Sequence, residues 1–208
     1  MTEIDNILEV EKYISDMDAV IFDLDDTLYP EKEYVRSGYK KIAEFFGRPE
    51  LADSMWGIFK RRGKAVDEVL ASSGLSGYRE DALLVYRFQR PDIQLYPGVA
   101  DMLERIRKSG KKTGIITDGR PEGQRAKLDV LKIKVDYIIV TDELGGVEFR
   151  KPNKVAFCQM KERLSIPFGR MVYVGDNPLK DFIAPDELGM KSIWFRNRDG
   201  IYAGTYKV

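Results

Sequence analysis

The stretch that decides the fold is AVIFDLDDT, residues 19–27. Its first half is a run of apolar, partly β-branched residues, and its second half is acidic. An apolar run without polar alternation is typical of a strand that is buried on both faces of a parallel sheet. We therefore predict a strand over residues 19–25. Because side chains alternate along a strand, Asp23 and Asp25 should project to the same side.

Four further apolar runs follow, and each ends in polar residues: KTGIITD (112–118), DYIIVTD (136–142), MVYVGD (171–176) and KSIWFR (191–196). Between the runs lie segments with the composition and periodicity of helices, at 98–110, 121–133, 153–166 and 179–190. This alternation predicts an α/β fold, a Rossmann-like doubly wound parallel sheet.

The segment after the first predicted strand breaks this rhythm. Residues 31–95 contain several stretches of helical character and no further strand signal. We interpret them as a small inserted helical domain. The predicted core then consists of residues 1–30 and 96–208.

Composition excludes several classes of protein. The 34 basic and 34 acidic residues give a net charge of zero, which argues against a nucleic-acid binder with its concentrated cationic surface. No apolar stretch is long enough for a membrane span, and the N-terminus lacks the pattern of a signal peptide. The single cysteine, Cys158, fits the reducing cytoplasm. Because the chain has no histidine, Ser-His-Asp catalysis and histidine-bound zinc are excluded.

Ligands of open α/β sheets bind beyond the carboxyl ends of the strands. Polar residues stand at these predicted ends: Asp23, Asp25, Thr117, Asp118, Asp142 and Asp176. Several carboxylates at one edge indicate a hard cation with oxygen ligands.

Three further elements indicate a site for a phosphate group and a metal ion. The Thr117 hydroxyl and the backbone amides of Asp118 and Gly119 can donate hydrogen bonds to phosphate oxygens. Lys151, in FRKPN, supplies a point positive charge. The segment GDNPLKD, residues 175–181, offers Asp176 to a metal.

The order and spacing of these elements resemble the four motifs of the haloacid dehalogenase superfamily of hydrolases, from about Ala19 to Trp194. The resemblance implies that Asp23 is the nucleophile, which forms an aspartyl-phosphate, and that Asp25 is the general acid and base. It assigns phosphate binding to Thr117 and the steadying of nucleophile and phosphate to Lys151.

The resemblance also implies a magnesium cofactor. Mg²⁺ would be held by Asp23, the backbone carbonyl of Asp25 and Asp176, with Asp181 as a supporting outer acid. Residues 31–95 match the position of the family's cap, which closes over a small substrate. One residue departs from the usual pattern, because Asp118 stands where the family often has asparagine.

Asp25 favours phosphate chemistry over dehalogenation, because an alkoxide leaving from phosphorus needs a proton and a halide does not. The sequence thus predicts a cytoplasmic, magnesium-dependent phosphatase that acts on a small phosphorylated metabolite. No sequence feature indicates its oligomeric state. Two alternatives stay open: a phosphomutase or phosphotransferase with the same residues, and a catalytically idle, metal-binding regulatory scaffold. Asp26 and Thr27 resemble the phosphatases more than the glycine-containing mutase sequence.

Overall fold

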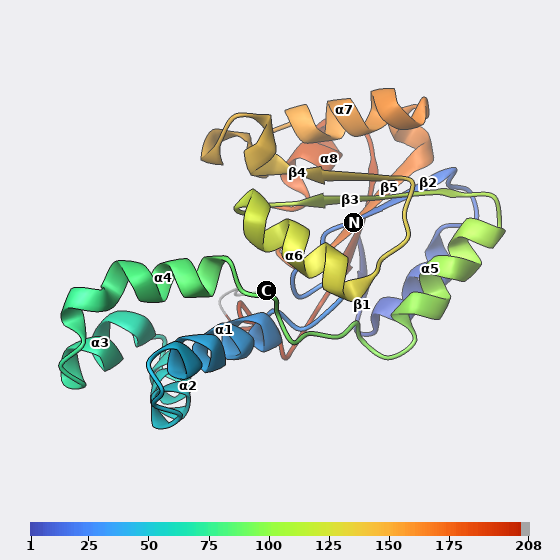
Figure 1. The fold of residues 1–208 in the computed structure, drawn as a ribbon. Coiled ribbons are helices and arrows are strands. Elements are labelled where there is room, and N and C mark those ends of the chain that lie inside the picture. The colour runs from blue at the N-terminus through green and yellow to red at the C-terminus, as the bar shows by residue number, and fades with distance from the viewer. Residues whose placement is uncertain (205–208) are drawn as a thin grey trace.

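The computed structural model describes residues 1–204, and a six-stranded sheet lies at its centre (Figure 1). The strands are β1 (Thr2–Ile4), β2 (Ala19–Phe22), β3 (Lys112–Thr117), β4 (Tyr137–Val140), β5 (Met171–Gly175) and β6 (Lys191–Phe195). All neighbours pair in parallel, in the order β1-β6-β5-β2-β3-β4. The predicted Rossmann-like α/β fold is confirmed.

The last four α-helices of the chain cover the two faces of the sheet, and the first four lie apart from it (Figure 1). The helices are α1 (Glu31–Phe45), α2 (Glu50–Lys60), α3 (Ala65–Ser72), α4 (Arg79–Arg87), α5 (Val99–Lys108), α6 (Pro121–Leu131), α7 (Val155–Leu164) and α8 (Ile183–Glu187). Short 3-10 helices cover Ile7–Tyr13, Ser76–Tyr78, Thr141–Leu144, Val147–Phe149 and Phe168–Arg170. Within residues 1–204, no helix is both long and apolar enough to cross a membrane.

The residues of β2 alternate between two hydrophobic clusters. Val20 and Phe22 pack with residues of α5 and α6, whereas Ala19 and Ile21 pack with residues of α7 and α8. All four side chains are fully buried. Burial on both faces is the reason that this strand has no polar alternation.

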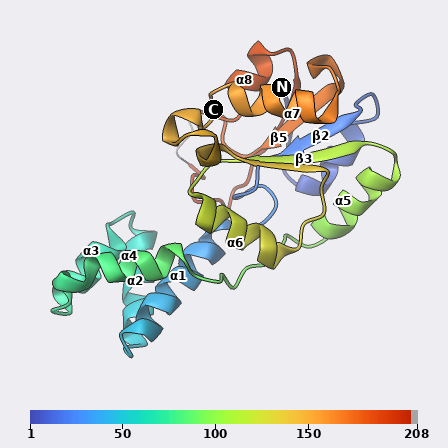
Figure 2. The same ribbon diagram turned by 45° about the horizontal axis from the view of Figure 1, so that its top comes forward.

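Helices α1–α4 form a separate layer beside the sheet (Figure 2). They pack around their own hydrophobic cluster, which includes Val35, Tyr39, Ile42, Leu51, Met55, Val69, Leu70 and Ala82. We call residues 31–87 the four-helix segment. The helical character predicted for this region is present as far as Arg87, and residues 88–98 return to the core without regular structure.

Three details differ from the predicted elements. Strand β2 ends at Phe22, and Asp26 adopts a left-handed backbone conformation (φ 53°), so strand alternation does not extend to Asp25. The last predicted helix is only five residues long, with Pro185 in its first turn. Strand β1, at the edge of the sheet, is not predicted from the sequence.

Because every strand is parallel, the carboxyl ends of all six meet at one edge. Figure 1 shows the arrowheads of β3 and β4 pointing toward the side on which the four-helix segment lies. The start of α6 faces the same side.

Candidate active site

The three central strands bring three predicted site residues together. Asp23 directly follows β2, and its backbone N–H still donates to Val174 O at 2.8 Å. Thr117 is the last residue of the neighbouring β3, and Asp176 follows β5 on the other side. All three side chains are buried. Their proximity follows from the strand order, since β2 lies between β3 and β5.

Lys151 joins the site from the loop before α7. Its Nζ lies 2.6 Å from Asp23 Oδ1 and 2.8 Å from Asp181 Oδ1, and it donates to Tyr173 Oη at 2.9 Å. The Lys151 side chain is fully buried. Burial opposes its charge, but the carboxylates of Asp181 and Asp23 outweigh this effect and hold the pKa of Lys151 well above its usual value.

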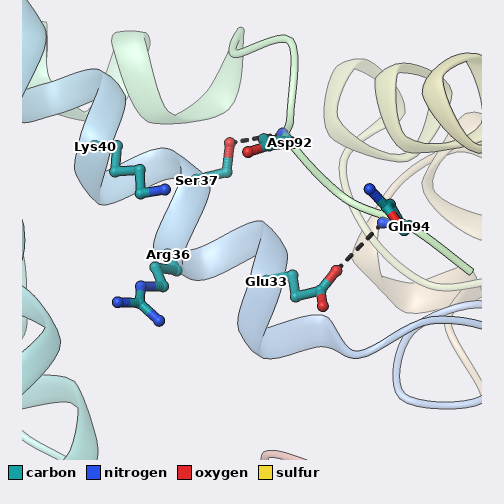
Figure 3. A pocket seen from close by; sticks show the side chains of 6 residues that line it. All are labelled: Glu33, Arg36, Ser37, Lys40, Asp92 and Gln94. Carbon is teal, nitrogen blue, oxygen red and sulfur yellow. Dashed lines mark hydrogen bonds between the residues drawn. The ribbon is translucent and has the colours of Figure 1, made fainter. Parts of the chain in front are cut away.

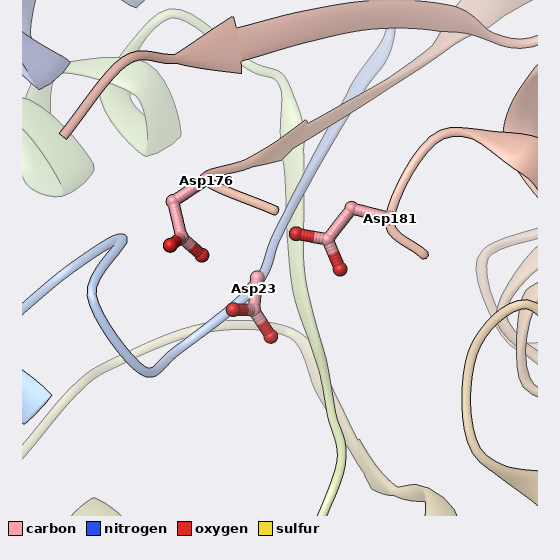
Figure 4. A group of neighbouring side chains, drawn as sticks. All are labelled: Asp23, Asp176 and Asp181. Carbon is pink, nitrogen blue, oxygen red and sulfur yellow. The ribbon is translucent and has the colours of Figure 1, made fainter. Parts of the chain in front are cut away.

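A cluster of three carboxylates forms around Asp23 (Figure 4). One oxygen each of Asp23, Asp176 and Asp181 lies within 4.8 Å of the others, and all three residues are buried. Asp181 is held by the N–H of Asn177, which donates to its Oδ2 at 2.9 Å. A Cβ at Gly175 would lie only 2.5 Å from that same oxygen, so this position requires glycine.

Two carboxylates of this cluster have raised pKa values. Burial, with the nearby charges of Asp181 and Asp23, raises the pKa of Asp176 well above its usual value. Burial also raises the pKa of Asp23 to about 6, although Lys151 opposes the change. Of the three buried carboxylates, Asp23 and Asp181 pair with Lys151, whereas Asp176 forms no ion pair within residues 1–204. A divalent cation with oxygen ligands fits such a set of donors.

Asp25 contacts a different lysine. Its carboxylate accepts from Lys127 Nζ at 2.6 Å, from Gln124 Nε2 at 2.8 Å and from the Tyr29 hydroxyl. Burial would raise the pKa of Asp25, but Lys127, Tyr29 and Gln124 together lower it below the usual value. The side chains of Asp23 and Asp25 thus have separate partners, although both line one pocket of about 200 Å³.

Helix α6 supplies two residues that contact predicted site residues and that sequence analysis missed. Gln124 also donates to Thr117 Oγ1 at 2.5 Å, and the buried Lys127 ammonium lies 4.2 Å from the centre of the Tyr34 ring. A signal was present in the sequence, because Gln124 and Lys127 share the apolar stripe of this helix with Leu128 and Leu131. Polar residues on such a stripe are buried and need partners.

The structure shows what the Asp118 side chain does. Its Oδ1 accepts from Thr141 Oγ1 and from the Lys151 backbone N–H, both at 3.0 Å, and its Oδ2 accepts from Lys180 Nζ at 2.9 Å. Asp118 therefore fixes the loop that carries Lys151. Lys180, in the GDNPLKD element, is a further cation near the site that sequence analysis did not select.

A larger pocket, of about 360 Å³, opens between the core and the four-helix segment. Asp25, Gly119 and Lys127 line it from the core, and Tyr86 and Arg87 line it from α4. Asp25 thus borders both this pocket and the smaller one that contains Asp23 and Asp176.

Another pocket, of about 330 Å³, lies between α1 and the returning connection (Figure 3). There the Asp92 N–H donates to Ser37 Oγ at 2.9 Å, and the Gln94 N–H donates to Glu33 Oε2 at 3.2 Å. None of the predicted site residues lines this pocket. Its hydrogen bonds attach the connection to α1.

The fold and the site define a class of protein, and comparison with known proteins then gives the family. A parallel α/β sheet with a buried lysine and an acidic cluster at its carboxyl edge is a framework for carboxylate-based chemistry on anionic substrates. The family model of haloacid dehalogenase-like hydrolases matches residues 17–187, so the chain belongs to this family. The family membership predicted from the sequence is confirmed.

The relatives of this chain include phosphatases. It is 28% identical over 203 residues to a glyceraldehyde 3-phosphate phosphatase of Methanopyrus kandleri, with 86% of this chain and 83% of the relative covered. It is 25% identical to a phosphoglycolate phosphatase of Synechococcus elongatus, with 90% and 89% covered. The solved structure of a HAD phosphatase from Thermococcus onnurineus superimposes with a TM-score of 0.54 at 27% identity, with 86% of each chain covered.

Proposed function

We propose that this chain is a magnesium-dependent phosphatase that hydrolyses a small phosphate monoester through an aspartyl-phosphate on Asp23. The observation that carries the proposal is the placement of two aspartates at one pocket, each with its own lysine: Asp23 beside Lys151, and Asp25 beside Lys127. The relatives named as phosphatases support the same class of reaction.

In the first step, a carboxylate oxygen of Asp23 attacks phosphorus, and the bond between phosphorus and the leaving oxygen breaks. Asp25 donates a proton to that oxygen, so an alcohol departs. Because Gln124 donates to Thr117 Oγ1, the hydroxyl proton of Thr117 is available for a phosphate oxygen. Lys151 and the amides of Asp118 and Gly119 oppose the remaining negative charge.

In the second step, water attacks phosphorus and gives a proton to Asp25. The acyl-phosphate P–O bond breaks, which releases phosphate and restores the Asp23 carboxylate. The contacts that lower the pKa of Asp25 keep its carboxylate ionised, and this is the state that can accept a proton. A bound phosphate monoester carries a charge of about −1.5 to −2. This charge raises the pKa of Asp25 again, so protonation of the acid accompanies substrate binding.

Asp23, Asp176 and the backbone carbonyl of Asp25 would hold the magnesium ion, with Asp181 supporting Lys151. The ion, when bound, would reduce the negative charge that the phosphate meets at this edge. We further propose that residues 31–95 act as the cap. The contribution of α4 to the larger pocket supports this role, since a cap selects substrates and excludes water.

The direct test is hydrolysis of para-nitrophenyl phosphate and of a panel of phosphorylated metabolites, with inorganic phosphate as the measured product. Phosphate release to water supports a phosphatase. Transfer to an added sugar hydroxyl with little free phosphate would indicate a mutase or phosphotransferase instead. Absence of turnover with every substrate would contradict the proposal and favour a regulatory scaffold.

The acidic cluster predicts how the protein responds to metal. EDTA should abolish turnover, and Mg²⁺ should restore it. Mg²⁺ at a hundredfold excess over its Kd should also raise the melting temperature by roughly 5–10 °C, because a ligand that binds only the folded state stabilises it.

A substitution separates this effect from general ion binding. Asp176→Asn removes one carboxylate of the cluster and should remove most of the thermal shift. Asp129→Asn, at an exposed position on α6, is the matched control and should keep the shift. Full activity in excess EDTA would contradict the metal assignment.

The contact between Lys127 and Asp25 predicts a positioning role for the lysine. Lys127→Met keeps most of the side-chain volume and removes the charge. We expect kcat for an alkyl phosphate to fall by roughly 10- to 100-fold, the range for one lost hydrogen bond to a charged group, with little change in KM. Lys127→Arg should restore part of kcat.

Steady-state kinetics measures this effect. Lys134→Met, an exposed lysine after α6, is the control and should behave as the parent protein. An increased KM with unchanged kcat would mean that Lys127 binds substrate and does not position Asp25.

A further inference from the structure

The larger pocket is placed to receive the part of the substrate that leaves. It shares Asp25 with the smaller pocket, which contains Asp23 and Asp176. A phosphate at Asp23 would therefore direct its ester oxygen past Asp25 and its alcohol portion into the larger pocket. This inference rests on the proposed function, and it concerns the chemistry of that alcohol portion.

Most charged groups around this pocket already have partners. Lys127 pairs with Asp25 at 2.6 Å, and Arg150 pairs with Asp142 at 2.7 Å. Asp118 pairs with Lys180 at 2.9 Å. None of these pairs leaves a net charge for a ligand.

Glu31 also lines the pocket, and it is the one carboxylate of the lining that forms no ion pair within residues 1–204. Burial, together with the neighbouring Asp25, raises the pKa of Glu31 to about 8.

Two arginines of the lining also form no ion pair within residues 1–204. Arg87, in the last turn of α4, and Arg120, directly before α6, both line the pocket, one from the four-helix segment and one from the core. Within residues 1–204, neither guanidinium forms an ion pair or a hydrogen bond. The dipole of α4 favours a cation near the C-terminus of the helix, where Arg87 lies. This interaction uses none of the N–H groups of Arg87, so they can still donate hydrogen bonds to a ligand.

We propose that Arg87 and Arg120 bind a second anionic group, a carboxylate or a further phosphate, on the alcohol portion of the substrate. The guanidinium group matches both anions, because its planar N–H groups donate in pairs to two oxygens. The substrate class is then a short phosphorylated metabolite with negative charge at both ends. The two arginines determine specificity and take no part in the transfer.

The test compares substrates that differ only in this second group. 3-Phosphoglycerate and glycerol 3-phosphate share a three-carbon skeleton, and the first has a carboxylate where the second has a neutral CH₂OH. Propane-1,3-diol bisphosphate and 3-hydroxypropyl phosphate make the same comparison for a second phosphate. We expect kcat/KM to be at least about tenfold higher for the anionic member of one pair, as hydrogen bonds to charged groups imply.

The arginine variants assign the preference to residues. Arg87→Met and Arg120→Met should each reduce the ratio of kcat/KM within the preferred pair by about tenfold, mainly through KM, and Arg87→Lys should keep part of it. Arg90→Met, at an exposed arginine outside the pocket, is the matched control and should leave the ratio unchanged.

The outcomes separate this inference from the proposed function. No hydrolysis of any of the four esters or of para-nitrophenyl phosphate would overturn the proposed function itself. Hydrolysis with equal kcat/KM within both pairs would overturn only the second-anion inference. A preference that survives both arginine substitutions would overturn the assignment to Arg87 and Arg120. The pair that shows the larger ratio identifies the anion as carboxylate or phosphate.

Discussion

Replacement of Asp23 by asparagine is expected to reduce turnover to background for every substrate. The amide is not a nucleophile toward phosphorus, so no phospho-enzyme can form. We expect kcat to fall by a factor on the order of 10⁴ or more, as for the loss of other enzymatic nucleophiles. The fold should persist, because Lys151 keeps its contacts with Asp181 and Tyr173.

Two measurements test this expectation. One is steady-state turnover of alkyl and aryl phosphates, and the other is the mass of the protein after rapid acid quench, which reports a retained phosphoryl group. Asp129→Asn is the matched control, since it makes the same chemical change at an exposed position on α6. A phosphoryl adduct on the Asp23→Asn protein would assign the nucleophile to another residue.

Asp25→Asn should produce a loss that depends on the leaving group. The nucleophile stays, but the proton donor is absent, which typically costs roughly 10²–10⁴-fold. An alkyl phosphate must expel a strongly basic alkoxide and should lose the full factor in the first step. Para-nitrophenyl phosphate expels a stable phenolate and should lose much less.

Single-turnover release of the leaving group is the measurement that isolates the first step. Overall turnover is less informative, because Asp25 also activates water in the second step and its loss affects both substrates there. Equal single-turnover losses for alkyl and aryl substrates, with chemistry limiting both, would exclude Asp25 as the acid. The Lys127→Met protein should show the same dependence on leaving group in weaker form, since it displaces the acid without removing it.

The two aspartates illustrate how far local sequence determines a site. An apolar run buried on both faces must end where the chain reaches solvent or a ligand, so AVIF followed by Asp23 indicates both the strand and its functional end. The same holds for Thr117 after β3 and Asp176 after β5. Parallel pairing then brings these ends to one edge, and this follows from the fold class alone.

Other features depend on contacts between distant residues. Strand β1 has only three residues, and it exists because it pairs with β6, about 190 positions later in the chain. A segment this short carries no periodicity, so its conformation is decided by the hydrogen bonds that the sheet edge offers.

The sequence by itself determined the α/β fold and the residues at the strand ends, because burial on both sheet faces leaves a local, readable pattern. Only the tertiary structure decided which lysine serves which carboxylate: Lys151 lies beside Asp23, 128 positions away, and Lys127 beside Asp25, 102 positions away. It also decided that Arg87 and Arg120 line one pocket, in which neither forms an ion pair within residues 1–204. The physical reason is that pairing and desolvation of charges depend on distances across the folded chain, and no local pattern of residues encodes those distances.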